Sequence, residues 1–228
     1  MNKSKPITFP YPNQKFIKTE ELFKKGFSYY MINRMVEENF VKKINGNTYE
    51  NLNYEGDESD YLYVSGYVDE GVVCLMSAAV YHNISTFRMS QVDVAIKQKS
   101  KVAILPDWPS IGIYYFSNQR YKLGMHSIPI DGGYFKIYDM EKTVCDLLSY
   151  RNKYGLEDSL AVLKNYLKRE DRNIDKLITY SKKLRCYNVL IKYLEVLLWA
   201  FKNQLKLGLK TEQSKKIEPF KKYLPFMV

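Results

Sequence analysis

The sequence contains few residues of the kinds that form metal centres or disulfide frameworks. Its three cysteines, Cys74, Cys145 and Cys186, form no Cys-x-x-Cys pair, which argues against a zinc site and against a disulfide framework. The two histidines, His82 and His126, have no histidine at metal-binding spacing, and we interpret both as ordinary structural residues. We therefore predict neither a metal nor a cofactor.

A long uninterrupted hydrophobic run is also missing. The first six residues lead into no apolar segment, so no signal peptide is expected. The longest apolar stretch, residues 189–201, is interrupted by Lys192 and Glu195, and it is too short and too charged to cross a bilayer. Together with the unpaired cysteines, this predicts a soluble cytoplasmic protein.

The residue patterns of common catalytic sites are absent from the sequence. A Mg²⁺-dependent nuclease needs a carboxylate two residues before a strand lysine, but Ala95 stands two residues before Lys97. A nucleotidyltransferase needs two carboxylates that alternate on one strand, and Asp93 has no such partner. P-loop and dinucleotide-binding glycine patterns are missing too. We predict no catalytic residues; the alternative is a nuclease or nucleotidyltransferase built on residues 92–146 and targeted by a winged helix.

Positive charge is abundant but unevenly distributed. The net charge is +10. Residues 1–50 carry nine Lys and Arg against five acidic residues, residues 51–149 carry eight against twelve, and residues 150–228 carry eighteen against eight. Basic ends suit a polyanionic partner, because Lys and Arg displace counterions from a phosphate backbone. The alternative, which charge alone leaves open, is a solvated lysine-rich surface.

The N-terminal pattern predicts a helix-turn-helix. Thr19 is a suitable N-cap for a first helix that begins with two glutamates. Gly26 permits a tight turn, and Ser28 caps a second helix over residues 29–38, whose apolar residues recur at helical spacing. Two short helices separated by a glycine turn are typical of a helix-turn-helix.

The segment that follows predicts a β-hairpin. Residues 40–44 alternate apolar and basic side chains, an Asn-Gly-Asn turn follows, and residues 48–49 resume a strand. A helix-turn-helix with such a hairpin is a winged helix, so we assign residues 1–55 to a winged helix-turn-helix DNA-binding domain. The alternative is a winged helix that is used for protein contacts.

A recognition helix presents hydrogen-bonding side chains to the bases, while neighbouring cations neutralise phosphates. Asn33 and Arg34 are the residue types that contact adenine and guanine through two hydrogen bonds. The predicted DNA-binding residues lie on the second helix, in the turn before it and on the wing: Lys24, Lys25, Ser28, Tyr30, Asn33, Arg34, Lys42, Lys43, Asn45 and Asn47.

Residues 56–228 are assigned to a second domain, and the predicted fold class is α+β. After an acidic linker at 55–60, this domain is predicted to contain a mixed α/β part (56–139) and a helical part (140–228). We predict helices at 72–82, 140–153, 157–169, 173–184 and 187–207, strands at 92–96, 102–105, 111–116 and 134–138, and a loosely held tail from Thr211.

The helical part carries a second basic face on successive helices. It would extend the contact with DNA or bind the nucleic acid that a partner attacks, and the sequence does not choose between them. The alternative is that these residues only keep the domain soluble. The residues are Lys164, Lys168, Arg169, Arg172, Lys182, Lys183 and Arg185.

Three segments resemble one known family. Residues 19–49, which run from Thr-Glu-Glu-Leu to Asn-Gly-Asn-Thr-Tyr, resemble the winged helix of AbiEi-type antitoxins. Residues 75–85 (LMSAAVYHNIS) are similar to the family's segment that contains Ser-Ala and His. Residues 137–148 (IYDMEKTVCDLL) are similar to its Val-Tyr-Ser-x-Glu-(Arg/Lys)-Thr-x-x-Asp-Leu-Leu signature. The order and spacing cover residues 19 to about 198.

The resemblance implies a specific function. Members of the family are antitoxins of bacterial abortive-infection (AbiE) systems, which are type IV toxin–antitoxin systems used in phage defence. The N-terminal domain represses its own operon by binding inverted repeats in promoter DNA. The C-terminal domain counteracts a nucleotidyltransferase-like toxin of the AbiEii type, encoded beside it, without forming a stable complex. These expectations come from the resemblance and not from charge or spacing.

Overall fold

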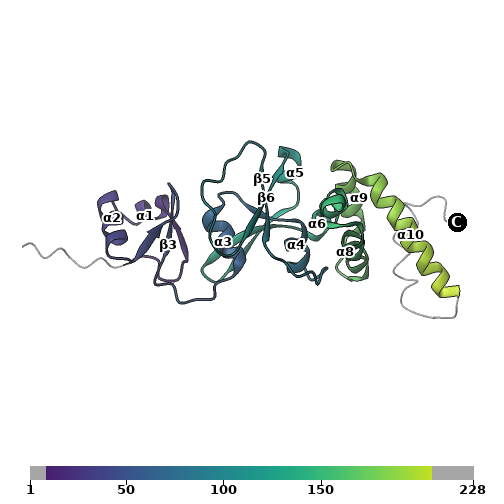
Figure 1. Cartoon of the computed structure of the whole chain (residues 1–228), viewed down its shortest axis with the longest axis horizontal. Helices are drawn as coiled ribbons and strands as arrows, with labels where there is room; N and C mark the ends of the chain where they lie inside the picture. Colours follow the sequence, from purple (N-terminus) through teal and green to yellow (C-terminus); the bar gives the residue numbers. More distant parts are fainter. Residues whose placement is uncertain (1–8, 207–228) are drawn as a thin grey trace, which may run out of the picture. The chain divides into compact units, whose positions relative to one another are not determined.

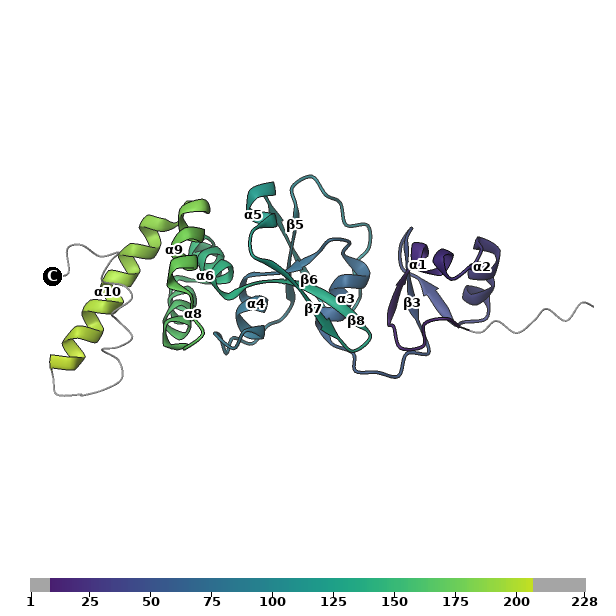
Figure 2. The same ribbon diagram turned by 180° about the vertical axis from the view of Figure 1, so that it is seen from behind.

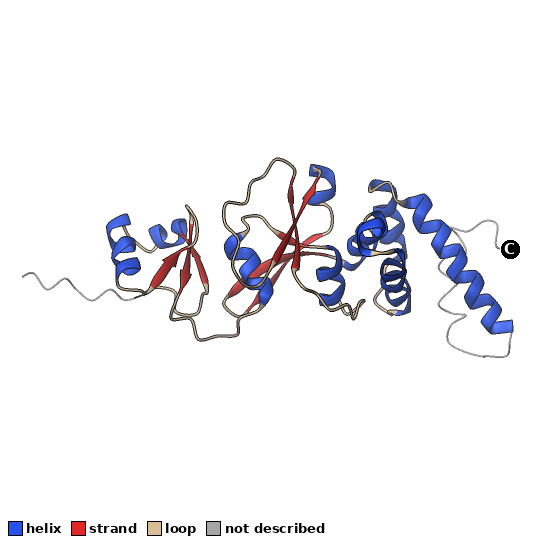
Figure 3. Ribbon diagram, viewed as in Figure 1, coloured by secondary structure: helices blue, strands red, loops and turns tan. Residues whose placement is uncertain are grey.

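The computed structural model describes residues 9–206 of the chain and the side chains of residues 9–197. Helices and strands both contribute (Figure 3), so the predicted α+β class is confirmed. The predicted loose tail from Thr211 lies outside the described residues. No helix within the described part is long and apolar enough to cross a membrane.

The chain folds into two units. Unit 1 contains the chain up to Val73 together with Ser90–Tyr121 and Met125–Ile137. Unit 2 contains Cys74–Met89, Lys122–Gly124 and the chain from Tyr138 onward. This division does not coincide with the predicted boundary after residue 55, because residues 56–73 belong to the same unit as the N-terminal part. Independent folding of residues 1–55 stays a prediction.

Unit 1 begins with two helices and a three-stranded antiparallel sheet (Figure 1). β1 (Phe16–Lys18) and β2 (Val41–Lys43) both pair with β3 (Thr48–Asn51), which gives the order β1-β3-β2. α1 (Thr19–Lys24) and α2 (Tyr29–Glu37) lie beside this sheet. The shared core consists of the buried side chains of Ile17, Leu22, Ile32, Met35, Val41 and Tyr49.

Local hydrogen bonds set the starts of the two helices. Ser28 caps α2, as predicted, because its Oγ accepts a hydrogen bond from the N–H of Met31 at 3.4 Å. The predicted cap at Thr19 is wrong: Thr19 is the first helical residue, and its buried hydroxyl has no hydrogen-bond partner among the described residues. The N-cap is Lys18, whose N–H donates to the Glu21 carboxylate at 2.9 Å.

The connections in this region follow the sequence pattern. Gly26 has a φ of +84° between the two helices, which glycine adopts without a steric penalty. β2 and β3 form the predicted hairpin around the turn at residues 45–47. β1 was not predicted, because three residues after a proline-rich segment give no period that identifies a strand.

The second sheet of unit 1 has five strands in the order β6-β5-β4-β8-β7. β4 pairs antiparallel with β5 and parallel with β8, while β5 and β6 are parallel. The unit also contains α3 (Asp60–Tyr67) and α5 (Asn118–Lys122). The strands are β4 (Val72–Val73), β5 (Val92–Lys97), β6 (Ile111–Phe116), β7 (Met125–Ile130) and β8 (Gly133–Tyr138).

The acidic segment at residues 55–60, which the sequence predicted to be a solvated linker, is mostly exposed and also makes defined hydrogen bonds. Ser59 caps α3 by accepting a hydrogen bond from the N–H of Tyr61 at 3.3 Å. The N–H of Asp57 donates to the Asp131 carboxylate at 3.0 Å. These two hydrogen bonds, one to the neighbouring Tyr61 and one to the distant Asp131, hold the segment in place.

Two further expectations need correction. Residues 72–73 form strand β4, so the predicted helix at 72–82 is the shorter α4 (Leu75–Tyr81). Residues 102–105 form no strand; they belong to the connection between β5 and β6, where the Ile104 side chain is 55% exposed. A short apolar run therefore indicates neither burial nor a strand partner by itself.

Unit 2 is helical. α4, α8 (Leu156–Lys168) and α9 (Ile174–Lys183) each pack against α6 (Met140–Ser149), and Figure 2 shows α8 and α9 beside α6. The predicted helix at 140–153 is broken at Tyr150 into α6 and α7 (Arg151–Tyr154). α8 and α9 agree with the predicted helices to within one residue, and α10 (Tyr187–Lys206) begins at the predicted residue, while its predicted end at 207 lies outside the described residues.

Candidate nucleic-acid interface

The two faces of α2 differ sharply in burial. Ile32 and Met35 are fully buried against the sheet. Tyr30, which is 72% exposed, and Asn33 lie on the outer face. Ser28 is exposed as well, but its hydroxyl is already engaged in capping the helix. The side chains most available to a ligand are therefore those of Tyr30 and Asn33.

Arg34 differs from its neighbours on α2. Its Nη2 donates to the Glu38 carboxylate at 2.6 Å, one helical turn further on. This hydrogen bond raises the pKa of Arg34 above its ordinary value. A guanidinium held in this way must leave Glu38, or share it, before it can contact a base.

Four predicted phosphate-neutralising lysines are exposed around α2. Lys24 and Lys25 end the first helix, and the ammonium of Lys25 lies 5.9 Å from the ring centre of Tyr11. Lys42 and Lys43 occupy β2, which is an edge strand of the three-stranded sheet. No ion pair engages any of these four side chains within the described residues.

An exposed aromatic pair beside α2 was missed by sequence reasoning. Phe23 and Tyr29 meet edge to face with ring centres 4.8 Å apart, and they are 39% and 65% exposed. The consecutive tyrosines at 29 and 30 were a possible signal, since only one of two adjacent residues at a helix start can face the core. Tyr29 precedes Asn33 by four residues on α2, so the two side chains lie on the same side of the helix.

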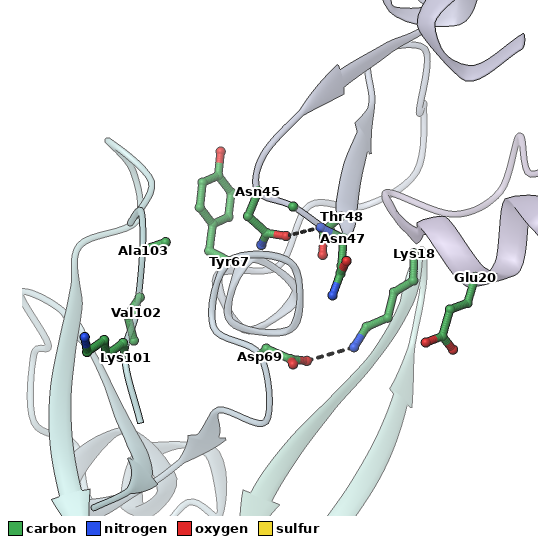
Figure 4. Close-up of a pocket in the computed structure, with 11 residues that line it drawn as sticks. Lys18, Glu20, Asn45, Asn47, Thr48, Tyr67, Asp69, Lys101, Val102 and Ala103 are labelled. Carbon is green, nitrogen blue, oxygen red and sulfur yellow. Dashed lines mark hydrogen bonds and ion pairs between the residues drawn. The ribbon is translucent and has the colours of Figure 1, made fainter. Parts of the chain in front are cut away.

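The predicted wing residues Asn45 and Asn47 line a cleft of about 350 Å³ within unit 1 (Figure 4). Asn45 Oδ1 accepts a hydrogen bond from the N–H of Asn47 at 2.9 Å and so shapes the turn. Lys18 and Asp69, which form an ion pair at 2.8 Å, contribute to the same cleft. No residue of α2 lines it, so the structure separates these two asparagines from the surface that contains Tyr30 and Asn33.

The second basic face falls into two groups. Lys164 and Lys168 lie on α8, and Arg169 and Arg172 follow it. Lys182 and Lys183 end α9, and Arg185 comes just after it. Because α9 rises about 1.5 Å per residue over ten residues, its two ends are about 15 Å apart. Arg172 and Lys182 therefore lie at opposite ends of α9, and a single basic face made by all seven residues stays a prediction.

The two arginines between α8 and α9 already have structural contacts. Arg169 forms two hydrogen bonds with the Asp171 carboxylate, at 2.7 and 2.9 Å. The Arg172 guanidinium donates to the backbone carbonyl of Arg169. Both arginines thus stabilise the connection between α8 and α9. Lys164 and Lys168 are exposed, whereas the two arginines are half-buried.

The sequence did not predict the buried polar network around α6. Lys142 and Asp146 form a fully buried ion pair, and the Lys142 ammonium lies 4.0 Å from the ring centre of Tyr138. Asp139 caps α6 by accepting a hydrogen bond from the N–H of Lys142 at 2.8 Å. Charges buried at this depth need partners, so the pair fixes α6 in unit 2.

Glu141 connects α6 to α8 and α9. Its carboxylate accepts hydrogen bonds from the Tyr166 hydroxyl at 3.0 Å and from the N–H of Asn173 at 3.3 Å, and it lies 3.1 Å from the Lys176 ammonium. Burial, and then the charge of Glu141, raise the pKa of Tyr166 far above its ordinary value. The phenol therefore remains a hydrogen-bond donor at all physiological pH values.

The residues weighed for chemistry have ordinary surroundings. His82 Nε2 lies 2.7 Å from the backbone oxygen of Tyr138, and burial lowers the pKa of this histidine. The buried carboxylate of Asp93 accepts a hydrogen bond from the Gln91 amide at 3.1 Å. Within residues 9–197, no three His, Cys, Asp or Glu side chains are grouped so that they could hold a metal ion.

No model of a known protein family matches this chain, and no curated protein matches it either. A function must therefore be argued from the arrangement of its own residues. The largest set of predicted site residues that the structure brings together is the outer surface of α2 with Lys24, Lys25, Lys42 and Lys43 around it.

Proposed function

We propose that this chain binds duplex DNA through the outer face of α2. In this proposal the segment from β1 to β3 acts as a winged helix-turn-helix, with α2 as the recognition helix. The supporting observation is the division of α2, which buries Ile32 and Met35 and leaves Tyr30 and Asn33 exposed. A recognition helix needs this division, because one face must pack on the domain while the other enters the major groove.

Sequence specificity and affinity would come from different residues. Asn33 can form two hydrogen bonds with an adenine in the major groove, and Tyr30 lies three residues earlier on the same exposed face. Lys24, Lys25 and Lys42 would neutralise phosphates, which strengthens binding to any sequence and makes it salt-dependent. Arg34 would contribute only after exchanging Glu38 for a base or phosphate.

The resemblance to AbiEi-type antitoxins extends the proposal. The DNA contact would repress the chain's own operon at inverted repeats in the promoter, and the chain would counteract a nucleotidyltransferase-like toxin without a stable complex. Unit 2, which contains α6 and most of the segment at 137–148 that is similar to the family signature, would supply antitoxicity. The buried side chains of that segment suit a scaffold for this role better than a contact surface.

A titration of labelled DNA tests the first part of the proposal. Fluorescence anisotropy would compare the duplex immediately upstream of the chain's own reading frame with a scrambled duplex at about 0.15 M salt. We expect the upstream duplex to bind at least about tenfold more tightly, since specific sites exceed non-specific ones by large factors. Equal affinity for the two duplexes would contradict sequence-specific binding.

Co-expression with the neighbouring toxin gene tests the second part. The Asn33→Ala variant of the full chain should lose repression of a promoter reporter and still restore growth when its expression is driven from an unrelated promoter. A shortened chain that begins at residue 61 is a poorer test, because the removal of residues 1–60 would cut unit 1 at the start of α3. Failure of wild-type protein to restore growth would contradict antitoxicity and leave the DNA-binding proposal standing.

A further inference from the structure

β6 forms one outer edge of the five-stranded sheet. Within the described residues it pairs only with β5. The carbonyl of Ser110 accepts a hydrogen bond from the N–H of Val92 at 2.7 Å, and that of Phe116 accepts one at 2.9 Å from Gln98, which directly follows β5. Because alternate residues of a strand direct their N–H and C=O groups to opposite sides, the even-numbered residues of β6 face β5. The backbone groups of Ile111, Ile113 and Tyr115 therefore point to the outer edge.

This edge strand is neither short nor marked by a charged residue or a proline. Natural edge strands are typically very short, or carry charged residues or proline. β6 is six residues long and reads Ile-Gly-Ile-Tyr-Tyr-Phe, with no charge and no proline. A tyrosine that is 54% exposed, Tyr115, lies on this strand.

The other edge strands of the described sheets differ from β6 in this respect. β7, at the opposite edge of the same sheet, contains Pro129. β1 and β2, at the edges of the small sheet, have three residues each and carry Lys18, Lys42 and Lys43. β6 is thus the one edge strand in the described part of the chain that is six residues long and has neither a charged residue nor a proline.

We propose that β6 pairs with the β6 strand of a second copy of this chain. Antiparallel pairing about a two-fold axis joins two identical strands, so any charged residue near the axis would meet its own like charge. β6 has no charged residue, and its three outward residues are two isoleucines and a tyrosine, which favour strands. The edge is therefore compatible with itself, whereas the lysine-bearing edges are not.

The direction of the outward backbone groups limits the register. Residues whose N–H and C=O point outward must face each other as hydrogen-bonded pairs. Of the symmetric registers, the one that pairs all three outward residues places Ile113 opposite Ile113 of the second copy and Ile111 opposite the second copy's Tyr115. This register forms about six backbone hydrogen bonds and joins two five-stranded sheets into one. A strand pair alone buries less area than a permanent dimer needs, so the dimer should depend on protein concentration.

Sedimentation equilibrium without DNA tests the association, independently of the proposed DNA contact. Wild-type protein should be dimeric at high micromolar concentration. Tyr115→Lys should weaken the dimer at least about tenfold, because it places a lysine on the edge. Tyr134→Lys is the matched control: Tyr134 is 51% exposed on β8, which has a neighbouring strand on each side. A monomeric wild-type protein, or equal effects of the two variants, would overturn the proposal.

Disulfide cross-linking tests the register. In the proposed pairing the two Cα atoms at position 113 lie about 5.5 Å apart, within the range that a disulfide spans. Ile113→Cys should therefore give a covalent dimer under mild oxidation, while Tyr115→Cys should not, because its counterpart in the second copy lies four positions away along the strand. The three natural cysteines are buried, and the wild-type protein that contains them gives the background level of cross-linking. Cross-linking of Tyr115→Cys but not Ile113→Cys would rule out this register.

Discussion

α2 and α6 are similar in length and in the way they begin, but they differ in whether their polar side chains are buried. α2 has nine residues and α6 has ten, and a side-chain oxygen caps each of them. α6 buries Glu141, Lys142 and Asp146, whereas α2 buries none of its polar side chains. The same classes of residue therefore stabilise the fold in one helix and remain available to a ligand in the other.

The difference has a physical cause. A buried charge loses its hydration and must be compensated by a partner inside the protein, so its position is fixed. An exposed polar side chain keeps its hydration and contributes little to stability, which leaves it free to exchange water for a ligand. Substitutions in α6 should consequently change the free energy of unfolding, and substitutions on the outer face of α2 should change binding.

The largest effect is expected from breaking the buried ion pair of α6. Asp146→Ala leaves the Lys142 ammonium buried without its partner, which should lower the free energy of unfolding by about 3–5 kcal/mol. Urea denaturation measures this change. Glu157→Ala removes an exposed carboxylate from α8 and should change stability by less than about 0.5 kcal/mol. Equal stability of the two variants would contradict a structural role for the buried ion pair.

A second effect concerns binding alone. Asn33→Ala should weaken binding to the upstream duplex by about 1–3 kcal/mol, because a contact to a base through two hydrogen bonds is lost. Its free energy of unfolding should stay within about 0.5 kcal/mol of wild type, since Asn33 is exposed. Asn188→Ala, at an exposed position of α10, controls for the chemical change. Unchanged DNA affinity of Asn33→Ala would remove this residue from the interface.

A smaller and sequence-independent effect is expected at β2. Lys42→Ala should reduce the slope of log affinity against log salt concentration by about one unit, on the upstream and the scrambled duplex alike. Lys192→Ala removes one exposed charge from α10 and should leave the slope unchanged. A slope that responds equally to both variants would show that only the overall charge of the protein matters.

The smallest effect on DNA affinity is expected from removing the carboxylate that pairs with Arg34. Glu38→Ala frees the guanidinium and should strengthen DNA binding by about 0.2–1 kcal/mol more than Glu37→Ala does. Glu37 lies next to Glu38 at the end of α2, is exposed, and forms no ion pair within the described residues, so the two variants change the net charge equally. The same gain from both would mean that Arg34 stays uninvolved.

Much of the fold could be predicted because the long helices have clear periodicity and caps. α8 and α9 were placed to within one residue, α10 begins at the expected residue, and Ser28 caps the helix that it was expected to cap. The misses are short elements such as β1, β4 and α3, whose two to eight residues are specified by neighbours in space. Local sequence contains too little information to identify such elements.

The candidate site could be predicted in part. Tyr30, Asn33 and the four lysines were placed on the correct elements, because amphipathic spacing identifies the exposed face of a helix. The ion pair of Arg34 with Glu38 has the spacing of helix neighbours, so it could have been expected from the sequence. The placement of Asn45 and Asn47 in a cleft could not, because that cleft also requires Tyr67, Asp69 and residues 101–103.

Hydrogen exchange with and without the upstream duplex tests the central claim most directly, because it locates the DNA on the protein. Slower exchange is predicted for backbone amides at residues 24–34 and 42–43 when the duplex is added, with no change in α6, whose side chains are buried in both states. Unchanged exchange throughout residues 19–51, or slowing confined to residues 164–185, would contradict the assignment of α2 as the DNA-binding surface.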